Sequence, residues 1–308
     1  MTRRDAHRMG HVALVVGGDS AEREVSLRGG QAVASALESL GVEFSVVDGP
    51  RRLLEQVAAG HFDRVFNLLH GRGGEDGALQ GALRLYGVPV TGSGVLASAL
   101  TMDKEQTKRV WRACDLPTPA WRAVERAEEH QIVLQDLEPP LFVKPAREGS
   151  SIGMSRVDEA TQLQPALELA LKHDQRALIE RLITGREFTA AVLDGRVLPL
   201  IELKAARVFY DYEAKYESGD TEYHCPADLP PDVEAELARV CLRAFAVVGA
   251  SGWGRVDFML DESGRPWLLE VNTTPGMTEK SLMPMAAKAA GIRFEELVWQ
   301  ILNTCRAD

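Results

Sequence analysis

The chain has little of what secreted, membrane-spanning or nucleic-acid-binding proteins need. Its 308 residues contain four scattered cysteines, Cys114, Cys225, Cys241 and Cys305, whose spacing argues against a zinc site and a disulfide framework. No apolar run approaches the ~20 residues of a membrane helix, and the basic start of the chain lacks the apolar stretch of a signal peptide. The net charge of −10 comes without a basic run, which disfavours nucleic acid as a partner. We therefore expect a cytoplasmic protein that binds neither membranes nor nucleic acid.

Two familiar nucleotide-binding signatures are also missing. The segment GGDSAEREVSL at 17–27 lacks Gly-x-Gly-x-x-Gly, so dinucleotide binding is not supported. The segment PLFVKPAREGSSIGM at 140–154 lacks the Walker A pattern, which requires Gly-x-x-x-x-Gly-Lys-Ser/Thr. If this acidic chain binds a polyphosphate, it must concentrate lysine and arginine locally.

What is present is an α/β alternation of strand and helix patterns. HVALVVGG at 11–18 is typical of a buried strand, and a helix with apolar residues at 33, 36, 37 and 40 follows it. Further strands at 42–48 and 64–69 predict a parallel sheet in the first ~95 residues. One helix is predicted over 101–114, and a strand predicted at 140–146 runs into a polar, glycine-bearing hairpin.

The strongest local signal is a β-hairpin near the end of the chain. GWGRVDFML at 252–260 and LLEVNTTPG at 268–276 are two strand patterns separated by a tight turn. If Ser263 and Gly264 are the two central turn residues, the numbers of antiparallel partners add up to ~527. That register sets the pairs that face each other on the two strands.

The predicted register brings two carboxylates together. Asp257 lies opposite Glu270, and Arg255 lies opposite Asn272, with all four side chains on one face. Two carboxylates ~4 Å apart repel by roughly 4 kcal/mol at an effective dielectric near 20, so the pair needs a counter-charge. A hard divalent cation supplies one, since Mg²⁺ takes Asp, Glu and Asn oxygens. The alternative is a surface hairpin whose charges face water.

Two lysines are candidates for a phosphate site. Lys144 ends a strand and precedes a loop of small residues, 149–153, whose N–H groups can fold over phosphates. Lys104 falls in the first turn of a predicted helix, where the helix dipole disfavours a cation unless an anion is bound. For each lysine the alternative is a solvated side chain.

Two residues of the first ~95 are candidates for substrate contacts. His70 follows an apolar strand at the edge where α/β sheets place ligands. Glu22 follows the first strand and is a candidate to hold an ammonium group. The alternatives are a histidine that caps its loop and an acidic residue favoured by the helix dipole.

The segment 204–224 loses periodicity and is rich in Tyr, Lys, Glu and Asp. A loop of that length is often a lid, and Lys215 and Tyr216 are its candidate site residues. Its alternative is an aromatic-rich surface loop. Glu180 and Glu187 flank a connection between strands and are candidates to contact adenine or ribose, the alternative being exposed charge.

These motifs together resemble one family. GGDSAEREVSLRGG, LHGRGGEDG, MDK, VKPAREGSSIGM, EFTAAVL, YDYEAKY, GRVDF and EVNTTPGMTEKSLMP occur in the order seen in the D-alanine–D-alanine ligases, which belong to the ATP-grasp superfamily. The resemblance spans about residues 11 to 303. It implies an N-terminal Rossmann-like domain at 1–96, a central domain at 97–180 and a C-terminal catalytic domain at 181–308, with ATP held between the last two.

The resemblance also implies an activity and its residues. ATP and two D-alanines are expected to react through an acyl phosphate, with two Mg²⁺ or Mn²⁺, to supply peptidoglycan synthesis. Phosphate and nucleotide contacts are implied for Lys104, Lys144, Ser151, Glu180, Ile183, Glu187, Phe209 and Lys215. Metal binding is implied for Asp257, Glu270 and Asn272. Substrate binding and catalysis are implied for Glu22, His70, Ser150, Tyr216, Arg255, Gly276, Ser281 and Leu282.

Departures from the family pattern are small. Lys280 stands where some relatives have His, and Thr274 where Ser is frequent; neither removes a ligand. Tyr216 favours a dipeptide product, because relatives that use D-lactate often lack a tyrosine there. The resemblance suggests a homodimer, while a monovalent-cation requirement stays open.

Overall fold

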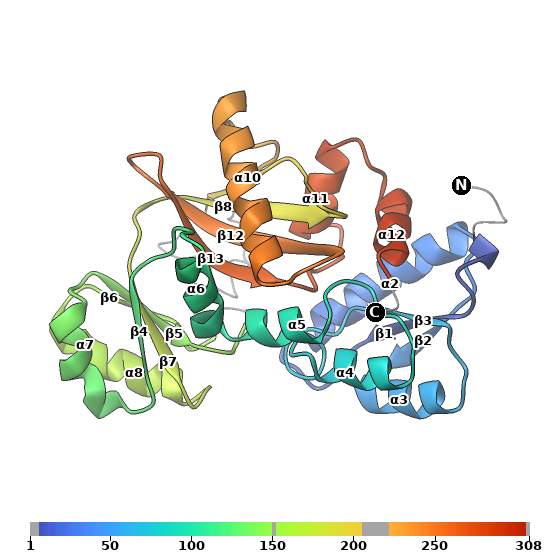
Figure 1. The fold of residues 1–308 in the computed structure, drawn as a ribbon, viewed down its shortest axis with the longest axis horizontal. Helices are drawn as coiled ribbons and strands as arrows, with labels where there is room; N and C mark the ends of the chain where they lie inside the picture. Colours follow the sequence, from blue (N-terminus) through green and yellow to red (C-terminus); the bar gives the residue numbers. More distant parts are fainter. Residues whose placement is uncertain (1–5, 150–151, 205–221, 306–308) are drawn as a thin grey trace.

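The computed structural model describes residues 6–149, 152–204 and 222–305 (Figure 1). The predicted site residues Ser150, Ser151, Phe209, Lys215 and Tyr216 lie outside these ranges, as does nearly all of the predicted lid at 204–224.

The first part of the chain is the predicted parallel sheet. Its strand order is β2-β1-β3, with both pairs parallel. The strand β1 is buried along its whole length, as expected for a parallel strand covered on both faces. The elements are β1 (Val12–Val16), α2 (Arg23–Ser39), β2 (Phe44–Asp48), α3 (Pro50–Ala58), β3 (Arg64–Asn67) and α4 (Ala78–Leu85).

The helix predicted over 101–114 is wrong as a single element. The chain forms α5 (Val95–Met102) and α6 (Lys104–Ala113). Asp103 is extended between them, and its carboxylate accepts a 3.1 Å hydrogen bond from the Gln106 N–H, a typical N-cap that ends one helix and begins the next. Lys104 therefore does occupy the first turn of a helix, as predicted.

The central part forms an antiparallel sheet in the order β4-β7-β5-β6, covered by helices on one face (Figure 1). The predicted hairpin after residue 140 is confirmed by the pairing of β5 with β6. The elements are β4 (Trp121–Val124), α7 (His130–Asp136), β5 (Leu141–Pro145), β6 (Ser155–Val157), α8 (Leu163–Leu171) and β7 (Ala177–Arg181).

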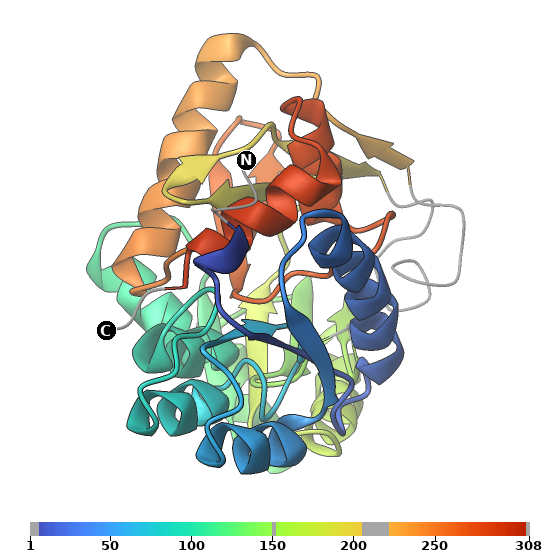
Figure 2. The ribbon, with the colours of Figure 1, turned by 90° about the vertical axis from the view of Figure 1, so that its right-hand side faces the viewer.

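The last part is built on a second antiparallel sheet, with the described strands in the order β11-β10-β8-β12-β13 and β9 paired to β8. Figure 2 shows the red helices α11 and α12 beside the blue N-terminal helix α2, with the orange α10 on the other side of the sheet. The elements are β8 (Gly185–Leu193), β9 (Arg196–Val197), β10 (Ile201–Lys204), β11 (Glu222–His224), α10 (Pro231–Val247), β12 (Trp253–Asp261), β13 (Pro266–Asn272), α11 (Leu282–Ala289) and α12 (Phe294–Asn303).

The hairpin β12–β13 has the predicted pairs but not the predicted turn. Asp257 pairs with Glu270, as predicted; beyond them a bulge shifts the register by one residue, so that Leu260 pairs with Pro266. The turn therefore contains an extra residue before Gly264, whose φ is +82°, a value that favours glycine. The bulge compensates for the longer turn.

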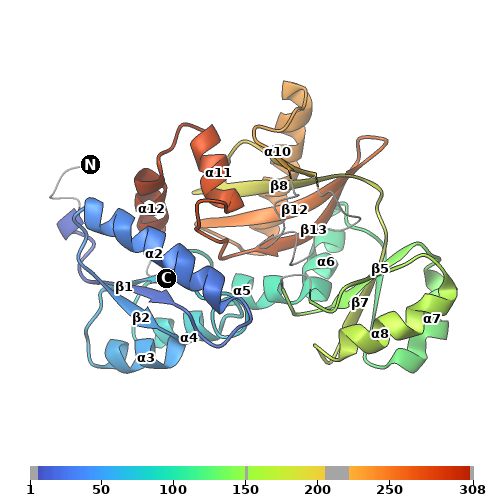
Figure 3. The same ribbon diagram turned by 180° about the vertical axis from the view of Figure 1, so that it is seen from behind.

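The end of the chain returns to its beginning. Helix α12 packs on α2, and both contribute to one hydrophobic core; Figure 3 shows them side by side from behind. This packing holds the N-terminal part against the last part of the chain. Over the described residues, no helix combines the length and apolar character needed to cross a membrane.

Candidate active site

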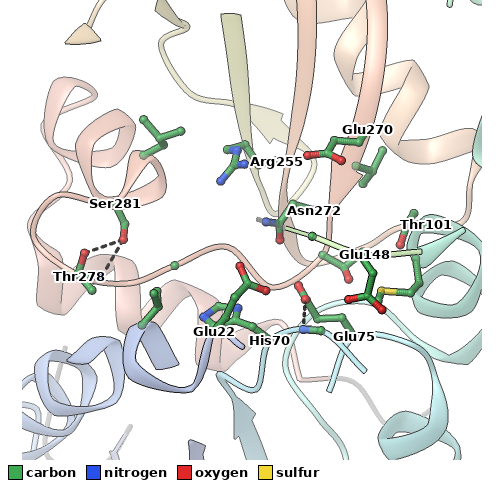
Figure 4. Close-up of a pocket in the computed structure, with 18 of the residues that line it drawn as sticks. Glu22, His70, Glu75, Thr101, Glu148, Arg255, Glu270, Asn272, Thr278 and Ser281 are labelled. Atoms are coloured by element: carbon green, nitrogen blue, oxygen red, sulfur yellow. Dashed lines mark hydrogen bonds between the residues drawn. The ribbon is translucent and has the colours of Figure 1, made fainter. Parts of the chain in front are cut away.

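A pocket lies where the N-terminal part faces the hairpin β12–β13 (Figure 4). Side chains from the loops after β1 and β3 form one wall, and β12, β13 and the loop that follows form the other. The predicted site residues that line it are Glu22, His70, Lys104, Arg255, Glu270, Asn272, Gly276, Ser281 and Leu282. The fold thus gathers residues that are up to ~260 positions apart in sequence.

One carboxylate of the predicted metal site is held by an arginine. Arg255 Nε and Nη2 each donate to an oxygen of Asp257 at 2.8 Å, and Thr189 Oγ1 donates to Asp257 Oδ1 at 2.6 Å. Arg255 and Asp257 are two residues apart on β12, so their side chains share one face. A bidentate pair of this kind fixes the guanidinium plane.

The other carboxylate is paired with a lysine from a different part of the chain. Lys104 Nζ lies 3.5 Å from Glu270 Oε2 and donates to the backbone oxygen of Glu148 at 2.7 Å. Arg255 and Lys104 thus supply the counter-charges for the pair. The predicted need for a counter-charge is thus met by the protein itself, which places a positive side chain against each acid.

The donor atoms nevertheless fit a hard cation. Asp257, Glu270 and Asn272 present carboxylate and amide oxygens, which Mg²⁺ prefers. Asn272 Oδ1 accepts a 3.0 Å hydrogen bond from the Thr274 N–H, which orients it. Within the described ranges, no group of three or more His, Cys, Asp or Glu side chains is arranged to hold a metal. A cation at this hairpin would therefore need further oxygen ligands from a bound substrate.

Glu180 and Lys144 form a buried ionic cluster outside the pocket lining. Glu180 Oε2 lies 2.5 Å from Lys144 Nζ, and Glu180 Oε1 forms an ion pair with Lys108. Glu180 is 3% exposed, so the alternative of an exposed charge is wrong. Burial raises the pKa of the Glu180 carboxyl, but the two lysines outweigh it and the pKa is lowered. The sequence analysis missed Lys108.

The N-terminal wall contains two acids and a histidine. Burial lowers the pKa of His70, although the charge of Glu22 opposes the change. Burial and Glu22 together raise the pKa of Glu75 to about 8, and the Gly71 N–H donates to Glu75 Oε2 at 2.5 Å. Glu22 itself occupies the N-cap position of α2 and lines the pocket. It can therefore interact favourably with the helix dipole and also bind an ammonium group of a substrate. Glu75 belongs to the GRGGEDG segment, but nothing in the segment indicated that this acid would be half-buried with a raised pKa.

Replacing Glu75 by glutamine tests this electrostatic arrangement. A carboxyl whose folded pKa is about 8 against an ordinary 4.5 costs stability progressively as pH rises from the lower to the higher value. We expect Glu75→Gln to raise Tm by at least ~2 °C at pH 8 and to change it little at pH 5. Differential scanning calorimetry at the two pH values measures this. Asp76→Gln, which changes the neighbouring acid, is the control, and an equal shift at both pH values would contradict the burial argument.

The far end of the pocket is shaped by a loop and the start of α11. Ser281 Oγ accepts from the Thr278 N–H at 3.0 Å and lies 2.8 Å from Thr278 Oγ1. A Cβ added at Gly276 would come within 2.9 Å of Ser281 Oγ, so a larger residue there would have to displace this hydroxyl from its hydrogen bonds with Thr278. Leu282 is the first residue of α11, whose N–H groups favour a bound anion. Lys280 also lines this end.

The remaining predicted residues lie away from the pocket lining. Ile183 is half-buried in the connection between β7 and β8, and Glu187 on β8 pairs with Leu203. Gly149 ends the described part of the predicted phosphate loop, and a Cβ there would lie 3.5 Å from Glu22 Oε2. Gly149, which also lines the pocket, therefore lies beside Glu22.

The comparisons with known proteins agree with this geometry. Family models described as D-ala D-ala ligase C-terminus and N-terminus match residues 110–303 and 48–93. A D-alanine–D-alanine ligase of Methylococcus capsulatus (strain Bath) is 53% identical over 97% of each chain. The crystal structure of the D-alanine–D-alanine ligase of Bacillus anthracis has a TM-score of 0.85 at 33% identity, and its complex with ATP has 0.82 at 30%, each over 96% of both chains. The chain therefore belongs to the D-alanine–D-alanine ligase family, with its ATP-grasp fold.

Proposed function

We propose that this chain joins two D-alanine molecules with ATP through a D-alanyl phosphate, releasing ADP and phosphate, as a step of peptidoglycan precursor synthesis. Membership of the family makes it an ATP-dependent ligase. The observation that carries the proposal is the pocket itself, in which Glu22 and His70 face Arg255 across a space bordered by Glu270 and Asn272 (Figure 4).

The first D-alanine binds between the two walls. Glu22 receives its ammonium group, and His70, kept neutral by its lowered pKa, lies near its carboxylate. That carboxylate attacks the γ-phosphorus of ATP, the bond to ADP breaks, and the acyl phosphate forms. The acyl phosphate gives the carboxyl carbon a good leaving group, which a free carboxylate lacks.

The second D-alanine binds at the end formed by Ser281 and Leu282. Its amine, after losing a proton, attacks the acyl carbon, and phosphate leaves once the tetrahedral intermediate collapses. Arg255 and the Gly276 N–H stabilise the oxyanion of that intermediate. Arg255 is suited to this because Asp257 holds its guanidinium in one orientation.

Lysines and acidic residues hold the nucleotide. Lys104, Lys144 and Lys215 contact phosphates, and Ser151, Phe209, Glu180, Ile183 and Glu187 complete the ATP site. Two Mg²⁺ or Mn²⁺ held by Asp257, Glu270 and Asn272 would neutralise charge on the transferring phosphoryl group. Glu22, Ser150 and Tyr216 link the closed lid, which keeps water from the acyl phosphate. The proposal includes a cytoplasmic homodimer.

One assay tests the proposal. ADP release is measured with D-alanine, L-alanine or D-lactate as the substrate, with and without Mg²⁺, and the product is identified by mass. We expect ADP release with D-alanine and Mg²⁺, one D-alanyl-D-alanine per ADP, and neither with L-alanine. ADP release without dipeptide, or a depsipeptide formed in preference to the dipeptide from mixed D-alanine and D-lactate, would overturn the proposal.

A further inference from the structure

Lys108 is a fully buried lysine that the proposed mechanism does not use. It lies on α6, four residues after Lys104, and is 0% exposed. Its Nζ lies 2.5 Å from Thr118 Oγ1, forms an ion pair with Glu180, and sits 5.5 Å from the centre of the Trp121 ring. A buried ammonium is costly unless it is paired, and Glu180 supplies the pairing charge here.

Lys108, Glu180 and Lys144 together form a cluster with one negative and two positive charges. Each oxygen of the Glu180 carboxylate engages a different lysine. If Lys108 were neutral, Glu180 and Lys144 would cancel each other. Lys108 thus leaves the cluster with a net positive charge beside the strand end that carries Lys144.

The cluster is also tied to the hairpin β12–β13. Thr118, which contacts Lys108, donates from its hydroxyl to the Leu268 oxygen at 2.8 Å, and the Leu268 N–H donates to the Pro117 oxygen at 2.9 Å. Leu268 lies on β13, two residues before Glu270. The side chain of Lys108 therefore connects the central sheet to the strand that carries the proposed metal ligands.

We propose that Lys108 is a positioning residue for the nucleotide: it holds one oxygen of Glu180 so that the other fixes Lys144, and it leaves Lys144 with charge available for the phosphates of ATP. The inference rests on the proposed function, in which Lys144 contacts ATP. Lys108 itself touches neither ATP nor D-alanine in this scheme, so its loss affects nucleotide affinity before it affects chemistry.

The charge of Lys108 is sensitive to pH. Burial lowers its pKa to about 8; Glu180 opposes the change, and the positive charges of Lys144 and Arg112 add to it. These three groups lie on β7, β5 and α6, and the contacts from β4 and its preceding segment, Trp121 and Thr118, are uncharged. As pH rises through about 8, Lys108 loses its proton and the cluster loses its net positive charge. The KM for ATP therefore rises above that pH.

The test compares wild type with Lys108→Met, Lys108→Arg and Arg112→Met from pH 7 to 9.5. At pH 7 we expect Lys108→Met to raise the KM for ATP about tenfold, equivalent to 1.4 kcal/mol, with kcat and the KM for D-alanine changed less than ~threefold. Its KM for ATP should not vary with pH over this range. Lys108→Arg, which stays charged, should keep a low KM at pH 7 and lose the rise above pH 8.

The control Arg112→Met removes a nearby charge on the same helix, one that stacks on Trp121 at 4.1 Å. Because Arg112 helps lower the pKa of Lys108, this variant should keep the low KM for ATP at pH 7 and show the rise in KM at a higher pH than wild type. An unchanged KM for ATP in Lys108→Met, or a rise above pH 8 that persists in Lys108→Arg, would overturn the inference. Calorimetric measurement of ATP binding without D-alanine tests the role of Lys108 separately from the proposed ligase activity. If wild type binds ATP but makes no dipeptide, the proposed function fails while the effect of Lys108 on ATP affinity is still measured.

Discussion

An Arg255→Ala variant is expected to lose about 10²–10³-fold in kcat, the usual effect of removing one oxyanion donor. The guanidinium is held by Asp257 through two hydrogen bonds of 2.8 Å, so it needs little reorganisation when negative charge develops near it. Single-turnover formation of D-alanyl-D-alanine measures the loss, and ATP binding measured separately shows whether the nucleotide site is intact.

Two further variants separate this effect from disruption of the hairpin. Arg265→Ala removes an exposed arginine of the same hairpin, stacked on Trp267 at 4.3 Å, and should retain wild-type turnover. Lys at position 255 keeps a charge beside Asp257 but lacks the planar fork of donors, so Arg255→Lys should recover only part of the lost rate. Near-normal turnover of Arg255→Ala would remove Arg255 from the mechanism.

The hairpin shows how far strand pattern alone leads. The pairing of Asp257 with Glu270 follows from alternation and from turn residues, and the structure confirms it. The turn was predicted one residue too short, and a bulge beyond Asp257 compensates. A bulge leaves no local signature in a sequence of alternating residues. Because the missed bulge offsets the turn that was predicted too short, the pairing at the site is correct and only the residues near the turn are paired wrongly.

Burial of charge was the part that the sequence could not predict. Glu75, Lys108 and Glu180 look like ordinary polar residues in their segments. In the fold Lys108 and Glu180 are buried, and Glu75 is half-buried with a raised pKa. Lys108 and Glu180 are 72 positions apart, and only the packing of α6 on the central sheet brings them together. Local periodicity carries no information about such pairs.

The same limit applies to the counter-charges of the acidic pair. The sequence predicted that Asp257 and Glu270 face each other but could not show that Lys104, from α6, reaches Glu270. With Arg255 on Asp257 and Lys104 on Glu270, the pair is neutralised before any metal binds. The proposed cation must therefore bind in competition with these contacts, and it gains the phosphates of ATP as additional ligands.

This competition makes the Mg²⁺ dependence of activity a sensitive measurement. We expect Glu270→Gln to raise the Mg²⁺ concentration for half-maximal activity by at least about tenfold, because one of two carboxylate charges is lost while the size of the side chain is kept. Glu262→Gln, an exposed acid in the turn of the same hairpin, is the matched control and should leave the Mg²⁺ dependence unchanged. A chelator should abolish dipeptide formation in wild type and in both variants. If Glu270→Gln and Glu262→Gln shared one Mg²⁺ dependence, Glu270 would be a partner of Lys104 alone, and the metal would have to bind through other groups.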